Sequence, residues 1–133
     1  MKLLLDTQLV LWAALGSEKL PASMLDLINE AETIPMFSAA SIWEVAIKSS
    51  LGRPDFQVDP GRLRRNLNDN GWQELAITGH HAAATAILPA LHKDPFDRLL
   101  VAQATVEGLV LWTADEVVAK YPGSVRLVKH ASR

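Results

Sequence analysis

Four carboxylates stand where apolar segments of the chain end or are interrupted. Two follow predicted apolar strands, one interrupts a mostly apolar helix, and one lies in the first turn of another helix. They are, in that order, Asp6, Asp115, Glu44 and Asp97. Carboxylate and water oxygens are the ligands that Mg²⁺ and Mn²⁺ prefer in proteins. If the fold brings the four acids together, they form a site where such a cation could polarise a phosphoryl oxygen and activate water for phosphodiester hydrolysis.

Each acid also has a purely structural explanation. Asp6 and Asp115 could cap helices by accepting hydrogen bonds from unpaired backbone N–H groups. Lys48 lies four residues after Glu44, and such a surface pair contributes about 0.3–0.5 kcal/mol. Asp97 near a helix start gains about 0.3–1 kcal/mol from the helix dipole. Two carboxylates about 4 Å apart repel by roughly 1–4 kcal/mol, so a cluster of four would require a cation.

Short apolar strands alternate with amphipathic helices along the chain. The predicted strands are 2–5, 34–37, 72–75, 109–113 and 125–128. The predicted helices are 7–15, 21–32, 38–51, 60–68, 78–88, 95–107 and 114–120. This alternation predicts a mainly parallel sheet with helices on both faces. Such sheets bind ligands beyond the carboxyl ends of their strands, and all four acids can reach that edge.

The helix at 95–107 has strong boundary signals at both ends. Asp94 is the expected N-cap, Pro95 suits the first helical position, and Gly108 is the expected stop. Capping explains Asp94, whereas Asp97 remains a candidate ligand.

Composition limits the class of protein. The chain has 133 residues, 49% of them hydrophobic, which predicts one globular domain spanning residues 1–133. It has no cysteine, which excludes thiolate chemistry and fits a cytoplasmic location. No apolar run is long enough to span a bilayer, and the N-terminal residues do not resemble a signal peptide. The net charge of −2 neither supports nor excludes a nucleic-acid partner, because neutralising the four acids would leave a weakly basic remainder.

The histidines do not predict a metal site. They are His80, His81, His92 and His130. None has the spacing of paired zinc ligands on a helix. His92 and Lys93 could contact a substrate phosphate, but we expect a solvated loop there. No phosphate-binding glycine loop is present, which argues against a P-loop enzyme or a Rossmann dehydrogenase.

Several other side chains could support the acids or hold a phosphate backbone. Arg62 and Arg65 share one face of a helix and could bind RNA phosphates, although a solvated face is the usual interpretation. Arg98 could pair with a rim carboxylate or with a phosphate. Thr7 and Thr113 could orient the neighbouring acids by hydrogen bonds.

Four segments together resemble a known family. They are 3–7, 41–48, 92–104 and 111–115, and the third, with the sequence HKDPFDRLLVAQA, is the most specific. In this order they resemble the PIN-domain family, and more narrowly the VapC-type toxins of bacterial type II toxin–antitoxin systems. The segments extend over nearly the whole chain.

The resemblance implies a three-layer α/β/α fold with a parallel five-stranded sheet. It implies a Mg²⁺- or Mn²⁺-dependent endoribonuclease that cleaves RNA with a metal-activated water. Asp6, Glu44, Asp97 and Asp115 match the four acidic positions, and the fourth position is the most variable, so Asp115 would bind metal only through water. Asp94 matches an extra acid of this subgroup. The resemblance also implies a cognate antitoxin that covers the acidic pocket, and a homodimer.

Two other classes of protein stay open. A PIN-like module could bind RNA or a protein without cutting, and would then show no metal-dependent rise in melting temperature. A phosphatase or a receiver domain would use a strand-end aspartate as phosphoacceptor. The phosphatase needs a second aspartate where Gln8 stands, and the receiver needs an acidic pair that residues 2–6 lack.

Overall fold

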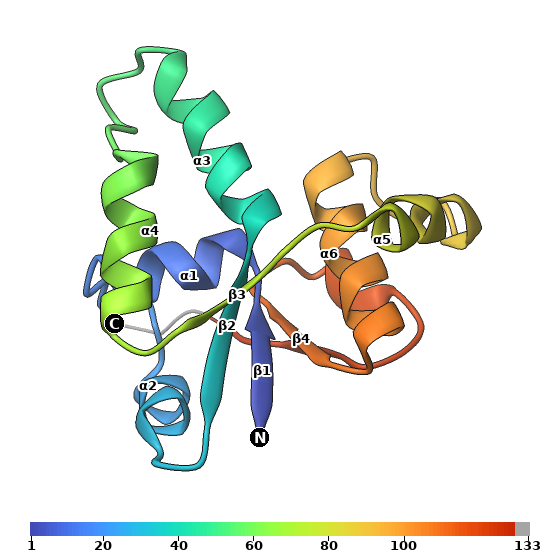
Figure 1. Ribbon diagram of the computed structural model, residues 1–133, viewed down its shortest axis with the longest axis horizontal. Coiled ribbons are helices and arrows are strands. Elements are labelled where there is room, and N and C mark those ends of the chain that lie inside the picture. The colour runs from blue at the N-terminus through green and yellow to red at the C-terminus, as the bar shows by residue number, and fades with distance from the viewer. Residues whose placement is uncertain (130–133) are drawn as a thin grey trace.

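The computed structural model describes residues 1–129 and is built on one five-stranded sheet (Figure 1). The strands are β1 (Lys2–Leu5), β2 (Ile34–Ser38), β3 (Gln73–Leu75), β4 (Val110–Thr113) and β5 (Val125–Leu127). Their order across the sheet is β3-β2-β1-β4-β5, and every pairing is parallel. The predicted parallel sheet is therefore confirmed, with β1 at its centre.

Six α-helices connect the strands. They are α1 (Thr7–Ala14), α2 (Ala22–Asn29), α3 (Ala39–Ser50), α4 (Pro60–Asp69), α5 (Gly79–Ala84) and α6 (Pro95–Glu107). Short 3₁₀ turns follow at Thr85–Ile87 and Val118–Lys120. Within residues 1–129, no helix combines the length and the apolar character needed to cross a membrane.

The helix predicted at 114–120 is wrong in type. Only Val118–Lys120 is helical, and it is a 3₁₀ turn. The segment is too short to repay the cost of nucleating an α-helix, and the backbone changes direction at Tyr121, which is extended at φ −64° and ψ 142°. Similarly, the helix predicted at 78–88 ends at Ala84 and continues as a 3₁₀ turn.

Alternate residues of the central strand supply two hydrophobic cores. Leu3 and Leu5 pack with α1, α2 and α4, whereas Leu4 packs on the opposite face with α6. Successive side chains of a strand point to opposite faces, so a strand covered by helices on both sides must be apolar throughout. The three-layer α/β/α arrangement is visible in Figure 1, with α1, α2 and α4 on one side of the sheet and α5 and α6 on the other.

The topology brings distant segments to one edge of the sheet. Parallel strands β1, β2 and β4 all end at this edge, so the residues after each strand lie near one another. Helix α6 precedes β4 and runs back across the sheet, which places its N-terminal turn at the same edge. Gly108 adopts the left-handed conformation, at φ 68°, that ends α6 before the chain enters β4.

Candidate metal centre

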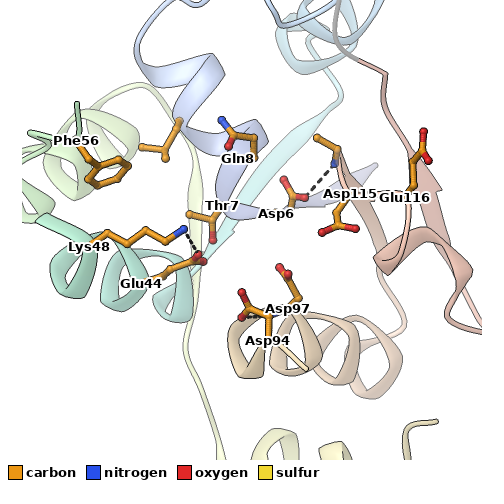
Figure 2. A pocket seen from close by; sticks show the side chains of 12 residues that line it. Asp6, Thr7, Gln8, Glu44, Lys48, Phe56, Asp94, Asp97, Asp115 and Glu116 are labelled. Atoms are coloured by element: carbon orange, nitrogen blue, oxygen red, sulfur yellow. Dashed lines mark hydrogen bonds and ion pairs between the residues drawn. The ribbon is translucent and has the colours of Figure 1, made fainter. Parts of the chain in front are cut away.

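An acidic pocket of about 490 Å³ opens at the carboxyl edge of the sheet (Figure 2). Its lining includes six carboxylates: Asp6, Glu44, Asp94, Asp97, Asp115 and Glu116. Lys48 is the only lysine or arginine in the lining. The fold thus brings together the four acids singled out in the sequence, and adds Asp94 and Glu116. A pocket with this excess of negative charge favours a bound cation.

Asp6 is held firmly at the end of β1. Its side chain is only 4% exposed. Oδ1 accepts a hydrogen bond from the N–H of Leu9 at 2.9 Å, which makes Asp6 the N-cap of α1. Oδ2 accepts from the Thr113 hydroxyl at 2.6 Å and from the Ala114 N–H at 3.0 Å. Burial raises the pKa of Asp6, and these hydrogen bonds oppose that rise.

Thr113 therefore orients Asp6, but Thr7 does not. The Thr7 hydroxyl donates to the Ser41 hydroxyl at 2.8 Å, inside the interface between α1 and α3. The spacing in the sequence placed both threonines beside an acid, and only the structure separates their roles.

Glu44 is a buried acid with one unsatisfied oxygen. Its Oε2 lies 2.7 Å from Nζ of Lys48, as the four-residue spacing predicts. Its Oε1 is buried and has no hydrogen-bond partner within the described part of the chain. An unpaired buried carboxylate oxygen costs free energy, and Glu44 lines the acidic pocket together with Asp94 and Asp97 (Figure 2). A divalent cation bound there would supply the missing partner.

Asp97 is an acid of the pocket with a strongly raised pKa. Burial raises the pKa of Asp97 to about 7, with further rises from the negative charges of Asp94, Glu44 and Asp6. His92 opposes this rise. Burial and the neighbouring acids disfavour the charged form of this carboxyl. A cation bound nearby would offset that repulsion and stabilise the carboxylate.

Asp115 is more fully occupied by hydrogen bonds. Its Oδ1 accepts from the N–H of Val117 at 2.7 Å and of Val118 at 3.3 Å, and its Oδ2 lies 3.1 Å from Nε2 of His92. Burial alone would raise the pKa of Asp115, but the hydrogen bonds from His92 and from the two backbone groups lower it. The predicted capping role of Asp115 is thus present within the pocket.

His92 does not lie in the solvated loop that we expected. Its ring is only 21% exposed, and Nε2 lies 3.2 Å from Oδ2 of Asp97 as well as 3.1 Å from Asp115. The search for paired histidines missed it because its partners are carboxylates. The signal available in the sequence was its place two residues before the Asp94 cap.

Asp94 caps α6 as predicted. Its Oδ1 accepts from the N–H of Phe96 at 2.8 Å and of Asp97 at 3.3 Å. Asp94 thereby fixes the turn that carries Asp97, in addition to lining the pocket.

We expect Asp94→Ala to lower the free energy of unfolding by about 1 kcal/mol, because the N-terminal N–H groups of α6 lose their acceptor. Asp94→Asn keeps an acceptor and should unfold at nearly the wild-type denaturant concentration. Urea denaturation followed by circular dichroism checks both. Equal destabilisation by the two variants would contradict a capping role.

Arg98 has a structural role. Within residues 1–129 it does not form the predicted pair with a rim carboxylate. Its guanidinium donates to the carbonyls of Thr85 at 2.8 Å and Pro89 at 3.0 Å, and to the Tyr121 hydroxyl at 3.2 Å. These bonds fasten the segment before α6 to the helix itself.

The other basic candidates lie outside the pocket. Arg62, Arg65 and Lys93 are exposed, and none of them lines the acidic cavity. A role for them in RNA binding therefore concerns a longer substrate that extends beyond the pocket.

Of the described histidines, His80 and His81 do not line the acidic pocket. His80 is exposed, whereas His81 is buried and its Nε2 lies 2.7 Å from Oε2 of Glu107. His130 lies outside the described residues. A histidine pair that could bind zinc is absent from residues 1–129, since the one mixed cluster that could hold a metal consists of His92, Asp97 and Asp115.

An all-parallel α/β/α sheet with acids gathered at its carboxyl edge defines a recognisable class of protein. The model of the PIN domain matches residues 3–124, so the chain belongs to the PIN-domain family. No curated protein sequence matches the chain.

Solved structures share the fold at low sequence identity. VapBC2 from Rickettsia felis, bound to a DNA fragment from its promoter, has a TM-score of 0.70 at 14% identity, covering 98% of this chain and 100% of that one. DNA-bound VapBC from Salmonella typhimurium has a TM-score of 0.65 at 16% identity, covering 96% and 97%. FitAcB from Neisseria gonorrhoeae has a TM-score of 0.57 at 19% identity, covering 87% and 89%. Likenesses at these identities support the fold.

Proposed function

We propose that this chain is a Mg²⁺- or Mn²⁺-dependent endoribonuclease, the toxin of a type II toxin–antitoxin pair. The observation that carries the proposal is the unpartnered buried Oε1 of Glu44, set in a pocket of six carboxylates. Membership of the PIN-domain family supports nuclease chemistry at this pocket. The proposed catalytic unit is a single domain spanning residues 1–133.

The hydrogen bonds suggest how the acids would share the work of holding the cation. Oε1 of Glu44 has no partner, and no hydrogen bond in the described structure reaches Oδ1 of Asp97, so these two atoms are the freest ligands. Asp6 has accepted three hydrogen bonds and would contribute a remaining lone pair. Asp115, bonded at both oxygens, would act through water.

The cation supplies a positive charge that polarises a phosphoryl oxygen and lowers the pKa of a coordinated water. The chain's own part is to fix the carboxylates in position. Thr113 and Ala114 hold Asp6, the α6 cap holds Asp97, and Lys48 holds one oxygen of Glu44. The ligands are all oxygens, which favours Mg²⁺ or Mn²⁺ over softer metals.

An RNA substrate would enter over the pocket rim. Lys48 is half-exposed at the pocket wall and could meet a backbone phosphate, while Arg62, Arg65 and Lys93 would contact more distant phosphates. Activity on cellular RNA implies a cytoplasmic location, in line with a chain that has no cysteine.

A protein partner is part of the proposal. Helix α3 and its C-cap residue expose an apolar stripe at four-residue spacing: Trp43 is 57% exposed, Ile47 39% and the C-cap Leu51 59%. Exposed apolar patches of this kind mark interaction surfaces. The stripe begins one residue before the Glu44 ligand, so a bound antitoxin or a second copy in a homodimer would lie beside the pocket.

The test is cleavage of a defined RNA by the purified protein. We expect cleavage with Mg²⁺ or Mn²⁺, none after addition of EDTA, and recovery when excess Mn²⁺ is restored. Mapping the ends of cellular RNA after induced expression would then identify the cleavage site. RNA binding without metal-dependent cleavage would instead identify the chain as a non-catalytic PIN-like module.

A further inference from the structure

Among the histidines of residues 1–129, His92 is the one whose ring contacts acids of the pocket. Its Nε2 and one oxygen each of Asp97 and Asp115 lie within 4.8 Å of one another. Such a trio looks at first like a mixed nitrogen and oxygen metal site. The hydrogen bond on the other side of the ring decides against that interpretation.

The ring nitrogen Nδ1 is already an acceptor. The backbone N–H of Asp94 donates to Nδ1 at 3.0 Å, so Nδ1 must present its lone pair there. A neutral imidazole carries its proton on the other nitrogen, which places N–H at Nε2. An Nε2–H group is a donor, and it cannot also offer a lone pair to a cation.

This donor faces two carboxylates at once. Nε2 lies 3.2 Å from Oδ2 of Asp97 and 3.1 Å from Oδ2 of Asp115. The two acids come from α6 and from the segment after β4, so His92 joins the two parts of the site. The ring contacts Oδ2 of Asp97, which leaves Oδ1 of the same carboxylate available to other partners.

The position of His92 is itself fixed by a buried side chain. The backbone N–H of His92 donates to the hydroxyl of Tyr121 at 3.0 Å, and Tyr121 is only 3% exposed. Arg98 donates to the same hydroxyl at 3.2 Å. The loop before α6 is therefore anchored through both its backbone and the His92 ring.

We infer that His92 is a positioning residue of the proposed cation site: it donates a hydrogen bond to Asp115, contacts Oδ2 of Asp97, and is not a metal ligand. This inference rests on the proposed function of the pocket. It assigns Oδ1 of Asp97 to the cation and explains why Asp115 is left to act through water. Groups that orient metal ligands in this way typically change metal affinity by 10–100-fold when they are removed.

Two variants separate the hydrogen bonds of the ring. His92→Asn can still accept from the Asp94 N–H but is too short to reach the two acids. His92→Gln can donate an amide N–H to them. We expect Mn²⁺ to bind about 10-fold more weakly to the asparagine variant, and within about 3-fold of wild type to the glutamine variant. Electron paramagnetic resonance of free Mn²⁺ measures both affinities without reference to RNA cleavage.

A metal-free measurement tests the same inference independently. Long-range ¹H–¹⁵N NMR spectra of the EDTA-treated protein report which ring nitrogen carries the proton, and we expect Nε2–H. A proton on Nδ1, equal Mn²⁺ affinity in the asparagine variant and wild type, or direct imidazole coordination in the Mn²⁺-loaded protein would each overturn the inference. Failure of the wild-type protein to bind Mn²⁺ would instead refute the proposed function, and the tautomer would still decide the role of His92 as a donor.

Discussion

Glu44→Gln is expected to reduce RNA cleavage by about 1,000-fold, which corresponds to about 4 kcal/mol of lost transition-state stabilisation. The substitution keeps the shape of the side chain and removes its charge. The cation would lose a negatively charged ligand. The neutral amide that replaces the carboxylate would bind it more weakly. Initial cleavage rates at saturating Mn²⁺ measure the effect.

The chain offers a matched control for this prediction. Glu74 also pairs with a basic side chain, Arg64, but it lies outside the acidic pocket. Glu74→Gln should therefore cut RNA at the wild-type rate. Cleavage by Glu44→Gln within about 3-fold of wild type would remove Glu44 from the proposed site.

Asp6→Asn is a less clean test than it seems from the sequence. Both oxygens of Asp6 accept hydrogen bonds, from Leu9, Thr113 and Ala114. An asparagine NH₂ would face a donor, leaving that donor unpaired, so loss of activity would be mixed with loss of stability. Asp97→Asn avoids this problem, because within residues 1–129 no hydrogen bond ends on the Asp97 carboxylate, which His92 only contacts at 3.2 Å.

Asp97→Asn is expected to make the metal-free protein more stable at pH 8, although it should abolish cleavage. Burial raises the pKa of Asp97 in the folded state to about 7 from its ordinary value of 3.8, so between these pH values the folded state holds a proton that the unfolded chain has released. Between about pH 4 and pH 7 the folded state binds more protons at Asp97, so the contribution of Asp97 to stability falls as pH rises. Removing the ionisable group removes this loss.

The size of the gain is modest because the carboxyl is partly exposed. Once solvent screening is allowed for, we expect about 1–2 kcal/mol at pH 8, or a rise in Tm of about 3–6 °C in EDTA. At pH 4 the variant and wild type should melt together. Adding Mn²⁺ at pH 8 should raise the Tm of wild type more than that of the variant.

Asp59→Asn is the matched control for the pH experiment. Asp59, like Asp97, lies at the start of a helix, but backbone hydrogen bonds from Arg62 and Gly61 lower its pKa. Its replacement should give no stabilisation at pH 8. If Asp97→Asn also fails to raise the Tm at pH 8, or if the Tm difference between the variant and wild type does not grow from pH 4 to pH 8, the repulsion assigned to the metal-free pocket is absent.

The sequence predicts the fold well where a single physical requirement dominates. A strand buried on both faces must be apolar throughout, and Leu3 to Leu5 satisfy this requirement. Pro95 and Gly108 mark the limits of α6 for reasons of local backbone geometry. Parallel strands then bring Asp6 and Asp115 to one edge, which follows from topology without any knowledge of side-chain contacts.

The details of the site depend on choices that spacing does not determine. Thr7 and Thr113 both adjoin an acid in the sequence, but packing of α1 against α3 gives Thr7 another partner. Arg98 had several acceptors within reach, and the loop carbonyls lie nearest. The contact of His92 with two acids depends on the conformation of an irregular loop. Sequence periodicity does not predict such a conformation.

The bond between Thr113 and Asp6 joins residues that are 107 positions apart. Ribosomes release a chain from its N-terminus, so Asp6 emerges long before the strand that orients it. The N–H of Asp6 also donates to the carbonyl of Trp112 in β4, which is synthesised equally late. If the pocket cuts RNA, a nascent chain cannot assemble it until nearly the whole protein has been made. The central position of β1 would then delay the proposed nuclease activity until translation is nearly complete.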